Sequence, residues 1–338
     1  MLPVEQTPWA QAWQHALYGP DGFYRQPVGP AGHFATATQG GPQMGAGEDG
    51  ALVTLMGEHG LTTVVDVGCG RGELLTAVHR AAPGLRCVGV DVVDRPDLPP
   101  GVGWVRAAGG AALPPGLSDL EDTLLLAHEW LDVVPCTVAQ VDHDGALREV
   151  LVDPATGRER LGGPLSAADA EWCRRWWPVD SASPGDRVEV GRGRDEAWAD
   201  LVSRLRSGLA LAVDYGHRRE ARPAGGTLTG YRDGRQVPPV PDGSCDLTAH
   251  VAMDSLVHDD LLDQRTALRR LGVSGATPPY ELATGNPAAY LTALATSSAA
   301  AALTARGGLG DFWWASRTVP PPAVERAQGV RDTGSLSL

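Results

Sequence analysis

The 338-residue sequence contains no lysine, and all 28 of its basic residues are arginine. Asparagine occurs only at position 286, so we attribute both features to a bias in genomic composition. Without lysine, the chain cannot form the Gly-Lys-Ser/Thr loop that binds nucleotide phosphates. It also lacks a Gly-x-Ser-x-Gly nucleophile turn, metal-ligand spacing and a Cys/His dyad. These absences argue against a phosphate-binding loop, a serine or cysteine nucleophile and a metal centre.

The five cysteines are scattered and include no C-x-x-C pair. Such a set favours reduced thiols in the cytoplasm and argues against a zinc site. The sequence has no charged-then-apolar leader and no run of about 18 apolar residues, so we expect no signal peptide, no membrane span and a cytoplasmic location. A net charge of −13 argues against nucleic acid or an anionic membrane as the main partner.

One stretch of the sequence, residues 64–73, reads as a buried strand, a glycine turn and the start of a helix. A second apolar run at 87–91 follows at strand spacing and also ends in an acid. The glycines allow a tight turn and a close approach to a ligand. Asp91 lies 23 positions after Gly68 (91 − 68), where a carboxylate can accept hydrogen bonds from ribose hydroxyls. The two runs predict the first half of a nucleotide-binding α/β domain.

The spacing of the glycines distinguishes between possible ligands. A dinucleotide fingerprint requires glycine at position 73, where this chain has Glu73. The pattern Asp-x-Gly-x-Gly-x-Gly, from Asp66 to Gly72, is instead typical of methyltransferases that use S-adenosylmethionine (SAM). In that interpretation Asp66 contacts the amino-acid end of SAM, and the glycines pass close to the sulfonium and the adenosine. A glycine turn without a ligand and a nicotinamide or flavin site are the alternatives.

The remaining apolar runs alternate with helical stretches, which predicts a doubly wound, mostly parallel sheet covered on both faces. We expect parallel strands at 62–67, 86–91, 102–107, 122–127 and 209–213, and an antiparallel last strand at 312–319. We expect helices from the cap Thr7-Pro8 to Leu17, and at 52–59, 195–207, 247–258, 260–272 and 286–305.

An insertion interrupts this pattern. Residues 138–152 read as a hairpin with its turn at Asp144-Gly145, and residues 163–180 read as a helix that contains three tryptophans. We interpret these tryptophans as packing residues, with a substrate platform as the alternative. The predicted units are an amino-terminal helix and lid loop (1–50), a core (51–137 and 185–318), the inserted subdomain (138–184) and a disordered tail (319–338).

Acidic residues follow three of the predicted strands, and ligands of parallel sheets bind at this edge. They are Asp91, the segment 128–132 and the segment 214–217. Methyl transfer needs proximity, alignment and exclusion of water. If the methyl acceptor is a guanidinium, the site needs carboxylates, because these pair bidentately with the N–H donors of the guanidinium. Glu129 is therefore a candidate for acceptor binding, assisted by Asp132, although a helix dipole also favours acids here. His217 and His128 are candidate bases or, alternatively, structural histidines.

Several segments resemble the MidA-type methyltransferases, the family of the mitochondrial complex I assembly factor 7. Leu126-Ala-His-Glu-Trp-Leu-Asp-Val-Val-Pro135 is similar to its Asn-Glu-Phe-Leu-Asp-Ala-Leu-Pro signature, and Val213-Asp-Tyr-Gly-His217 is similar to its Ile-Asp-Tyr-Gly-His. Further matches, in the family's order, are Gly22-Phe-Tyr24, Gly32-His-Phe34, Thr227-Leu-Thr-Gly-Tyr231 and Asp246-Leu-Thr-Ala-His-Val251.

This resemblance implies a class I, Rossmann-like methyltransferase that converts SAM to S-adenosylhomocysteine without a metal. It also implies a protein substrate with an accessible arginine, such as a respiratory-complex subunit. The implied cofactor contacts are Asp66, Gly68, Cys69, Gly70, Gly72, Asp91 and His128. The implied catalytic residues are Glu129, Asp132 and His217, and the implied acceptor pocket contains Phe34, Asp214, Tyr215 and Tyr231.

The sequence departs from the family pattern at four places. His33 and Gln39 replace family acids, His128 replaces an asparagine, and residues 107–110 offer no acid for the adenine amino group. Three hypotheses follow: a protein-arginine methyltransferase, a small-molecule methyltransferase, and a non-catalytic SAM-binding assembly or scaffold protein.

Overall fold

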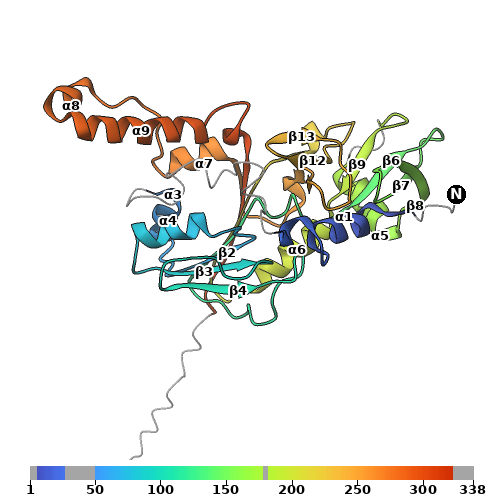
Figure 1. The fold of residues 1–338 in the computed structure, drawn as a ribbon, viewed down its shortest axis with the longest axis horizontal. Helices are drawn as coiled ribbons and strands as arrows, with labels where there is room; N and C mark the ends of the chain where they lie inside the picture. Colours follow the sequence, from blue (N-terminus) through green and yellow to red (C-terminus); the bar gives the residue numbers. More distant parts are fainter. Residues whose placement is uncertain (1–5, 27–49, 178–181, 323–338) are drawn as a thin grey trace, which may run out of the picture.

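The computed structural model describes residues 6–26, 50–177 and 182–322, and a seven-stranded sheet lies at its centre (Figure 1). The strand order is β16-β17-β10-β5-β2-β3-β4. Five neighbours are parallel: β10 (Gly208–Asp214), β5 (Thr123–His128), β2 (Thr63–Val67), β3 (Arg86–Asp91) and β4 (Val102–Arg106). β17 (Trp313–Val319) runs antiparallel to β10 and also pairs with β16 (Asp260–Asp263). The predicted parallel strands and the antiparallel last strand are confirmed.

Helices cover both faces of this sheet, as expected from its continuous apolar strands. In β5, Leu124 and Leu126 face one core cluster, and Leu125 and Ala127 face another. The first cluster includes residues of four helices, α3 (Ala51–Glu58), α4 (Glu73–Ala81), α7 (Gln264–Arg270) and α9 (Pro287–Leu303). The second includes residues of α6 (Arg192–Ser203). Because strand side chains alternate, the central strand β5 buries both of its faces.

A second, antiparallel sheet contains the predicted hairpin. The hairpin strands β6 (Thr137–Val141) and β7 (Leu147–Val152) pair as expected. The sequence did not predict β8 (Glu159–Pro164) or β9 (Arg187–Val190), which extend this sheet. Helix α5 (Ala167–Trp176) is shorter than the expected helix at 163–180, and α6 begins three residues before the expected position. The division into domains stays a prediction.

The amino-terminal helix α1 spans Trp9–Tyr18 and packs beside the second sheet. The predicted cap at Thr7 is wrong, because Thr7 and Pro8 form β1, which pairs with β7. Pro8 occupies the cap position and makes no side-chain cap bond. The indole of Trp13 donates a hydrogen bond to the Leu247 carbonyl at 3.1 Å. Long-range pairing therefore fixes the start of this helix.

The predicted helix at 247–258 is wrong. This region forms β14 (Asp246–Thr248), β15 (Val251–Ala252) and a 3₁₀ turn (Met253–Ser255). β14 pairs with β12 (Thr229–Arg232), which also pairs with β13 (Arg235–Val237), and β15 pairs with β11 (Gly216–His217). The expected helix at 260–272 begins only at Gln264, because residues 260–263 pair with β17. Tertiary pairing overrides local helix propensity at both places.

Helices α8 (Tyr280–Gly285) and α9 form a hairpin that projects from the body of the molecule (Figure 1). Helix α9 agrees with the helix expected at 286–305. Among the described residues, none of the helices combines the length and apolar character needed to cross a membrane. Most of the predicted lid loop, residues 27–49 with His33, Phe34 and Gln39, lies outside the described residues, as does most of the predicted tail.

Candidate cofactor and acceptor site

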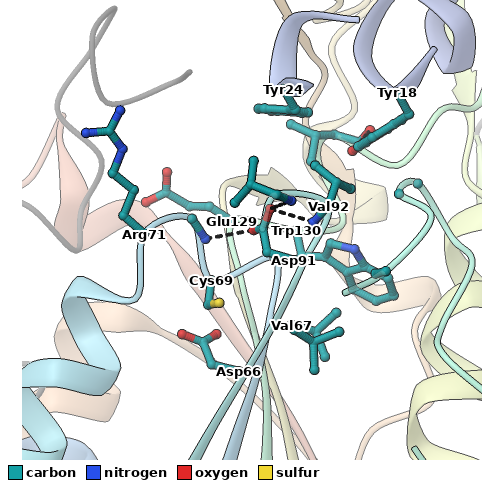
Figure 2. Close-up of a pocket in the computed structure, with 18 of the residues that line it drawn as sticks. Tyr18, Tyr24, Asp66, Val67, Cys69, Arg71, Asp91, Val92, Glu129 and Trp130 are labelled. Carbon is teal, nitrogen blue, oxygen red and sulfur yellow. Dashed lines mark hydrogen bonds between the residues drawn. The ribbon is translucent and has the colours of Figure 1, made fainter. Parts of the chain in front are cut away.

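A cavity of about 870 Å³ lies at the carboxyl ends of β2, β3 and β5 (Figure 2). The turn after β2, the end of β3, the loop after β4 and the segment after β5 all line it. Tyr18 of α1 and Tyr24 of the 3₁₀ turn η1 (Phe23–Arg25) line the cavity from the opposite side to Asp66. Segments that are far apart in the sequence therefore surround one space.

The glycine turn leads from β2 into α4. Gly68, Gly70 and Gly72 have φ angles of 74°, 60° and 76°, which L side chains rarely adopt. A Cβ atom on Gly68 would also lie 3.0 Å from Cδ1 of Trp130, another residue of the cavity wall. The turn therefore requires glycine, and its bare backbone faces the cavity.

Asp91 ends β3 and is anchored by backbone amides. Its Oδ2 accepts a hydrogen bond from the Gly70 amide at 2.8 Å, and its Oδ1 accepts one from the Val92 amide at 2.6 Å. Burial raises the pKa of this carboxyl to about 6, although these amide bonds act in the opposite direction. The carboxylate is thus fixed in position while it still lines the cavity.

Asp66 lies in β2 at the deep side of the cavity, with 2% of its surface exposed. Within the described part of the chain, its Oδ1 has no hydrogen-bond partner. Burial, followed by the negative charges of Asp91 and Glu73, raises the pKa of this carboxyl well above its usual range. Buried polar atoms are almost always paired, so this orphaned oxygen indicates a place for a ligand that donates a hydrogen bond.

His128 and Glu129 follow each other at the end of β5. Burial lowers the pKa of His128 to about 4, and neither ring nitrogen has a hydrogen-bond partner among the described residues. Glu129 has a φ of 52°, and its amide donates to the Val213 carbonyl at 2.9 Å. A non-glycine residue in this conformation stores strain, which is common at functional sites. The strained backbone directs Glu129 into the cavity (Figure 2).

Asp132 lines the cavity, whereas Asp214 does not. The Asp132 carboxylate lines the cavity and accepts hydrogen bonds from the hydroxyls of Tyr215 and Thr248, the latter at 2.6 Å. Its second oxygen, Oδ1, is buried without a partner in the described residues. Asp214 does not line the cavity; its Oδ2 accepts from the amides of Leu131 and Asp132, at 3.0 and 3.2 Å. Asp214 thus holds the segment that carries Asp132.

Tyr18, Tyr24 and Asp246 also line the cavity, although sequence reasoning did not select them as site residues. The Tyr24 hydroxyl donates to Oδ1 of Asp246 at 2.8 Å, and the two tyrosine rings lie 5.4 Å apart. Burial raises the pKa of Asp246 to about 8, and the charge of Asp132 adds to this effect. Both Tyr24 and Asp246 lie in segments that resemble motifs of the MidA-type family, and this resemblance is the sequence signal that could have identified them as site residues.

Arg194 holds the acid-bearing segments together. Its guanidinium is 1% exposed and donates to four backbone carbonyls, those of Asp132, Val134, Ala249 and His250, at 2.6 to 3.0 Å. Two of these carbonyls follow β5 and two follow β14. One side chain from α6 therefore sets the distance between the two segments.

Four of the expected site residues that the structure describes do not line the cavity, and Asp214 is one of them. Gly72 starts α4, and Tyr231 lies in β12. Phe34 lies outside the described residues. His217 packs its ring against Trp177 at 5.3 Å, and its Nδ1 lies 2.8 Å from Nη1 of Arg222. Burial and the charge of Arg222 lower the pKa of His217 to about 3. The remaining expected residues line the cavity, and their roles stay predictions.

Among the described residues, one group offers three potential metal ligands close together. It consists of Asp142, His143 and Asp144 in the turn of the β6–β7 hairpin, and none of the three lines the cavity. Two of them are exposed, and Asp142 already accepts from Arg148 Nε at 2.8 Å. The group therefore has no geometric relation to the cavity.

The raised pKa of Asp246 predicts a pH-dependent stability. The pKa of the Asp246 carboxyl is higher in the folded protein than in the unfolded chain. Such a carboxyl contributes its full stabilisation of the fold below the unfolded pKa, and this contribution is lost as the pH rises toward the folded pKa of about 8. We expect Asp246→Asn to gain stability relative to the wild type between pH 5 and pH 8, by up to about 1.4 kcal/mol per pH unit. Urea unfolding of both proteins at the two pH values measures this difference. A constant difference would contradict the buried, protonated state of Asp246.

Comparison with known proteins gives one family match and several structures of similar fold. The family described as putative S-adenosyl-L-methionine-dependent methyltransferases matches residues 96–271. Two solved structures from Burkholderia thailandensis share the fold at 20% identity, and each covers 93% of this chain. The first, described as a likely methyltransferase bound to S-adenosylhomocysteine, has a TM-score of 0.72 over 88% of its own length. The second, an uncharacterised protein, has a TM-score of 0.68 over 87%.

No curated protein matches the chain. The family match, in contrast, covers more than half of the sequence and includes β5 with the acidic segment that follows it, β10 and β14. The chain therefore belongs to the family of putative SAM-dependent methyltransferases.

Proposed function

We propose that this protein is a class I, Rossmann-like methyltransferase that transfers the methyl group of SAM to an arginine guanidinium of a protein. The acceptor follows from the resemblance to the MidA-type enzymes, and the cavity supports it. The observation that carries the proposal is that one cavity joins the glycine turn and Asp91 to buried acids from two other segments.

The sheet topology supports a Rossmann-like arrangement. From β2, the chain adds β3 and β4 on one side and later adds β5 and β10 on the other. In open parallel sheets, ligands bind at such a switch point, beyond the carboxyl ends of the strands. The cavity lies at this point, beside the turn after β2.

The residues around the turn fit SAM. The orphaned Oδ1 of Asp66 suits the ammonium group of its methionine part, because a charged donor would pair with a buried carboxylate. The bare turn at Gly68 permits close approach, and Asp91 suits the ribose hydroxyls. The bound S-adenosylhomocysteine of the Burkholderia thailandensis protein, which has the same fold, supports this assignment.

The acidic end of the cavity fits a cationic acceptor. Glu129, Asp132 and Asp246 line it, and burial raises the pKa of the two aspartates. A guanidinium would supply the missing positive charge and donors for the unpartnered Oδ1 of Asp132. Bound SAM would give up its methyl group from the sulfonium and become S-adenosylhomocysteine, while the accepting nitrogen would form the new bond to carbon and lose a proton to a cavity carboxylate such as Glu129. The role of the carboxylates is to align the planar acceptor and to balance its charge.

Titration calorimetry tests the cofactor. We expect SAM and S-adenosylhomocysteine to bind with micromolar dissociation constants, about −8 kcal/mol, and NAD not to bind. Asp91→Ala removes an acceptor of two ribose hydrogen bonds, each worth about 1.5 kcal/mol or more to a charged group, so the affinity falls at least tenfold. Asp144→Asn, at an exposed position in the hairpin turn, serves as the control and leaves it unchanged. Absence of binding in a folded sample would contradict the proposal.

Methyl-labelled SAM tests the acceptor. Peptides that contain arginine should become labelled on the guanidinium, whereas matched peptides with citrulline, its neutral isostere, should not. Label that appears only in the small-molecule fraction of an extract would favour a small-molecule acceptor. SAM binding without turnover on any acceptor would favour the scaffold hypothesis.

A further inference from the structure

Strand β14 places two polar side chains on one face. Asp246 and Thr248 are two residues apart, so both point to the same side of the strand. Thr248 donates to Oδ2 of Asp132, and Asp246 lines the same cavity as Asp132. Two buried carboxyls from distant segments therefore face one space, where they are 3% and 2% exposed.

Neither carboxyl has a cationic partner in the part of the chain that the structure describes. Within the described residues, no arginine or histidine nitrogen lies within 4.0 Å of either one, although the structure contains many such pairs elsewhere. The charge of Arg194 lowers the pKa of Asp132, but the four side-chain hydrogen bonds of Arg194 all go to backbone carbonyls. Two buried acids without a counter-ion are costly unless a ligand supplies one.

Aromatic rings and further ionisable groups complete the surroundings of Asp246. Tyr24 donates to it, and the ring of Tyr18 packs beside that of Tyr24. The titratable groups with the largest effects on Asp246 are Tyr24, Asp132 and Glu129, and Asp246 in turn affects Tyr18 and Cys245. All of these are neutral or negative when they titrate, so none can neutralise a carboxylate. Aromatic faces and carboxylates together favour a delocalised cation.

We propose that Asp246, paired with Asp132 and held by Tyr24, is the specificity determinant that selects a cationic acceptor and rejects its neutral isostere. This inference rests on the proposed function, which placed Asp246 among the acids at the acceptor end but assigned to no residue the choice between cationic and neutral acceptors, and left Tyr24 without a role. A neutral acceptor leaves the carboxyls without a counter-ion when they ionise, whereas a guanidinium pairs with the ionised forms. The site therefore discriminates by charge at a position remote from the glycine turn.

The ionisation of Asp246 links this selection to pH. Because burial raises its pKa to about 8, Asp246 is mostly protonated at neutral pH when no ligand is bound. A cation binds the ionised form more tightly, so its affinity must increase as the pH approaches 8. The hydrogen bond from Tyr24 lowers the pKa of Asp246, so removal of that hydroxyl raises it further.

Calorimetric titration with N-acetylarginine amide and N-acetylcitrulline amide, from pH 6 to pH 9 with and without S-adenosylhomocysteine, tests the inference. For the wild type we expect arginine affinity to rise up to tenfold per pH unit below pH 8, and citrulline to bind at least tenfold more weakly than arginine at pH 8. Asp246→Asn should remove the pH dependence attributable to this group and most of the discrimination. Tyr24→Phe should keep the discrimination and shift the midpoint of the pH profile upward.

The controls separate this inference from folding and from the cofactor. Glu281→Gln removes one negative charge from the exposed start of α8 and should behave like the wild type. Tyr24→Phe keeps the carboxylate, so it remains informative if Asp246→Asn does not fold. Equal binding of the two probes, or an unchanged pH profile in both variants, would overturn the inference even if SAM binds and arginine is methylated. Charge discrimination without SAM binding would instead refute the proposed function and leave the cation site standing.

Discussion

Replacement of Arg194 by methionine is expected to lower the free energy of unfolding by about 3–5 kcal/mol. The buried guanidinium donates to the carbonyls of Asp132, Val134, Ala249 and His250, and methionine would leave all four unpaired. Each buried, unsatisfied group costs about 1–3 kcal/mol, and partial relaxation reduces the sum. Urea unfolding followed by circular dichroism at pH 7 measures the change.

Arg192→Met provides the matched control, two residues earlier in α6. Arg192 is partly exposed and pairs with the buried Asp169 and the exposed Glu196, at 2.7 and 2.6 Å. The exposed pair contributes about 1 kcal/mol or less, and Asp169 keeps the Ser166 hydroxyl as a partner, so this variant should lose less stability than Arg194→Met. Equal losses in the two variants would show that Arg194 contributes only as an ordinary helix residue.

The second large effect is expected from Glu129→Gln, which should reduce methyl transfer to an arginine peptide about 10²–10³-fold. Glutamine keeps the size of the side chain but removes the charge that balances the guanidinium. Because the proposed SAM contacts are Asp66, the turn at Gly68 and Asp91, the affinity for SAM should change less than about threefold, a difference below 1 kcal/mol. Initial rates with labelled SAM and calorimetry on the same preparation separate the two effects.

Glu121→Gln is the control for Glu129→Gln. Glu121 precedes β5 at its opposite end, where its side chain is 61% exposed. Its replacement should leave both the rate and the affinity for SAM unchanged. If Glu129→Gln methylated the peptide at the wild-type rate, the proposed acceptor role of Glu129 would be wrong.

The cofactor end of the cavity could be predicted because its determinants are local. The turn at Gly68 and the acid at Asp91 each follow directly after a continuous apolar strand, and such strands are recognisable without tertiary information. The parallel neighbours then bring these positions together by the rule that ligands bind at the carboxyl ends.

The acceptor end depends on long-range pairing, which the sequence pattern does not reveal. β14 has three residues and exists because it pairs with β12, so residues 247–258 read as a helix from their composition. Consequently Asp246 was recognised only as part of a motif. His217 was predicted to be a site residue because it closely follows β10, but it does not line the cavity. It lies in β11, which pairs with β15, and its ring packs against Trp177.

The position of β17 has a consequence for protein synthesis. This strand is inserted between β10 and β16, and no strand among the described residues comes later in the chain. Until the ribosome has made residues 313–319, β16 has no sheet partner and β10 exposes one edge. Exposed edges of this kind recruit other chains. A nascent chain that stalls before Trp313 therefore carries a nearly complete cavity on an unfinished sheet, and such truncated products are expected to aggregate.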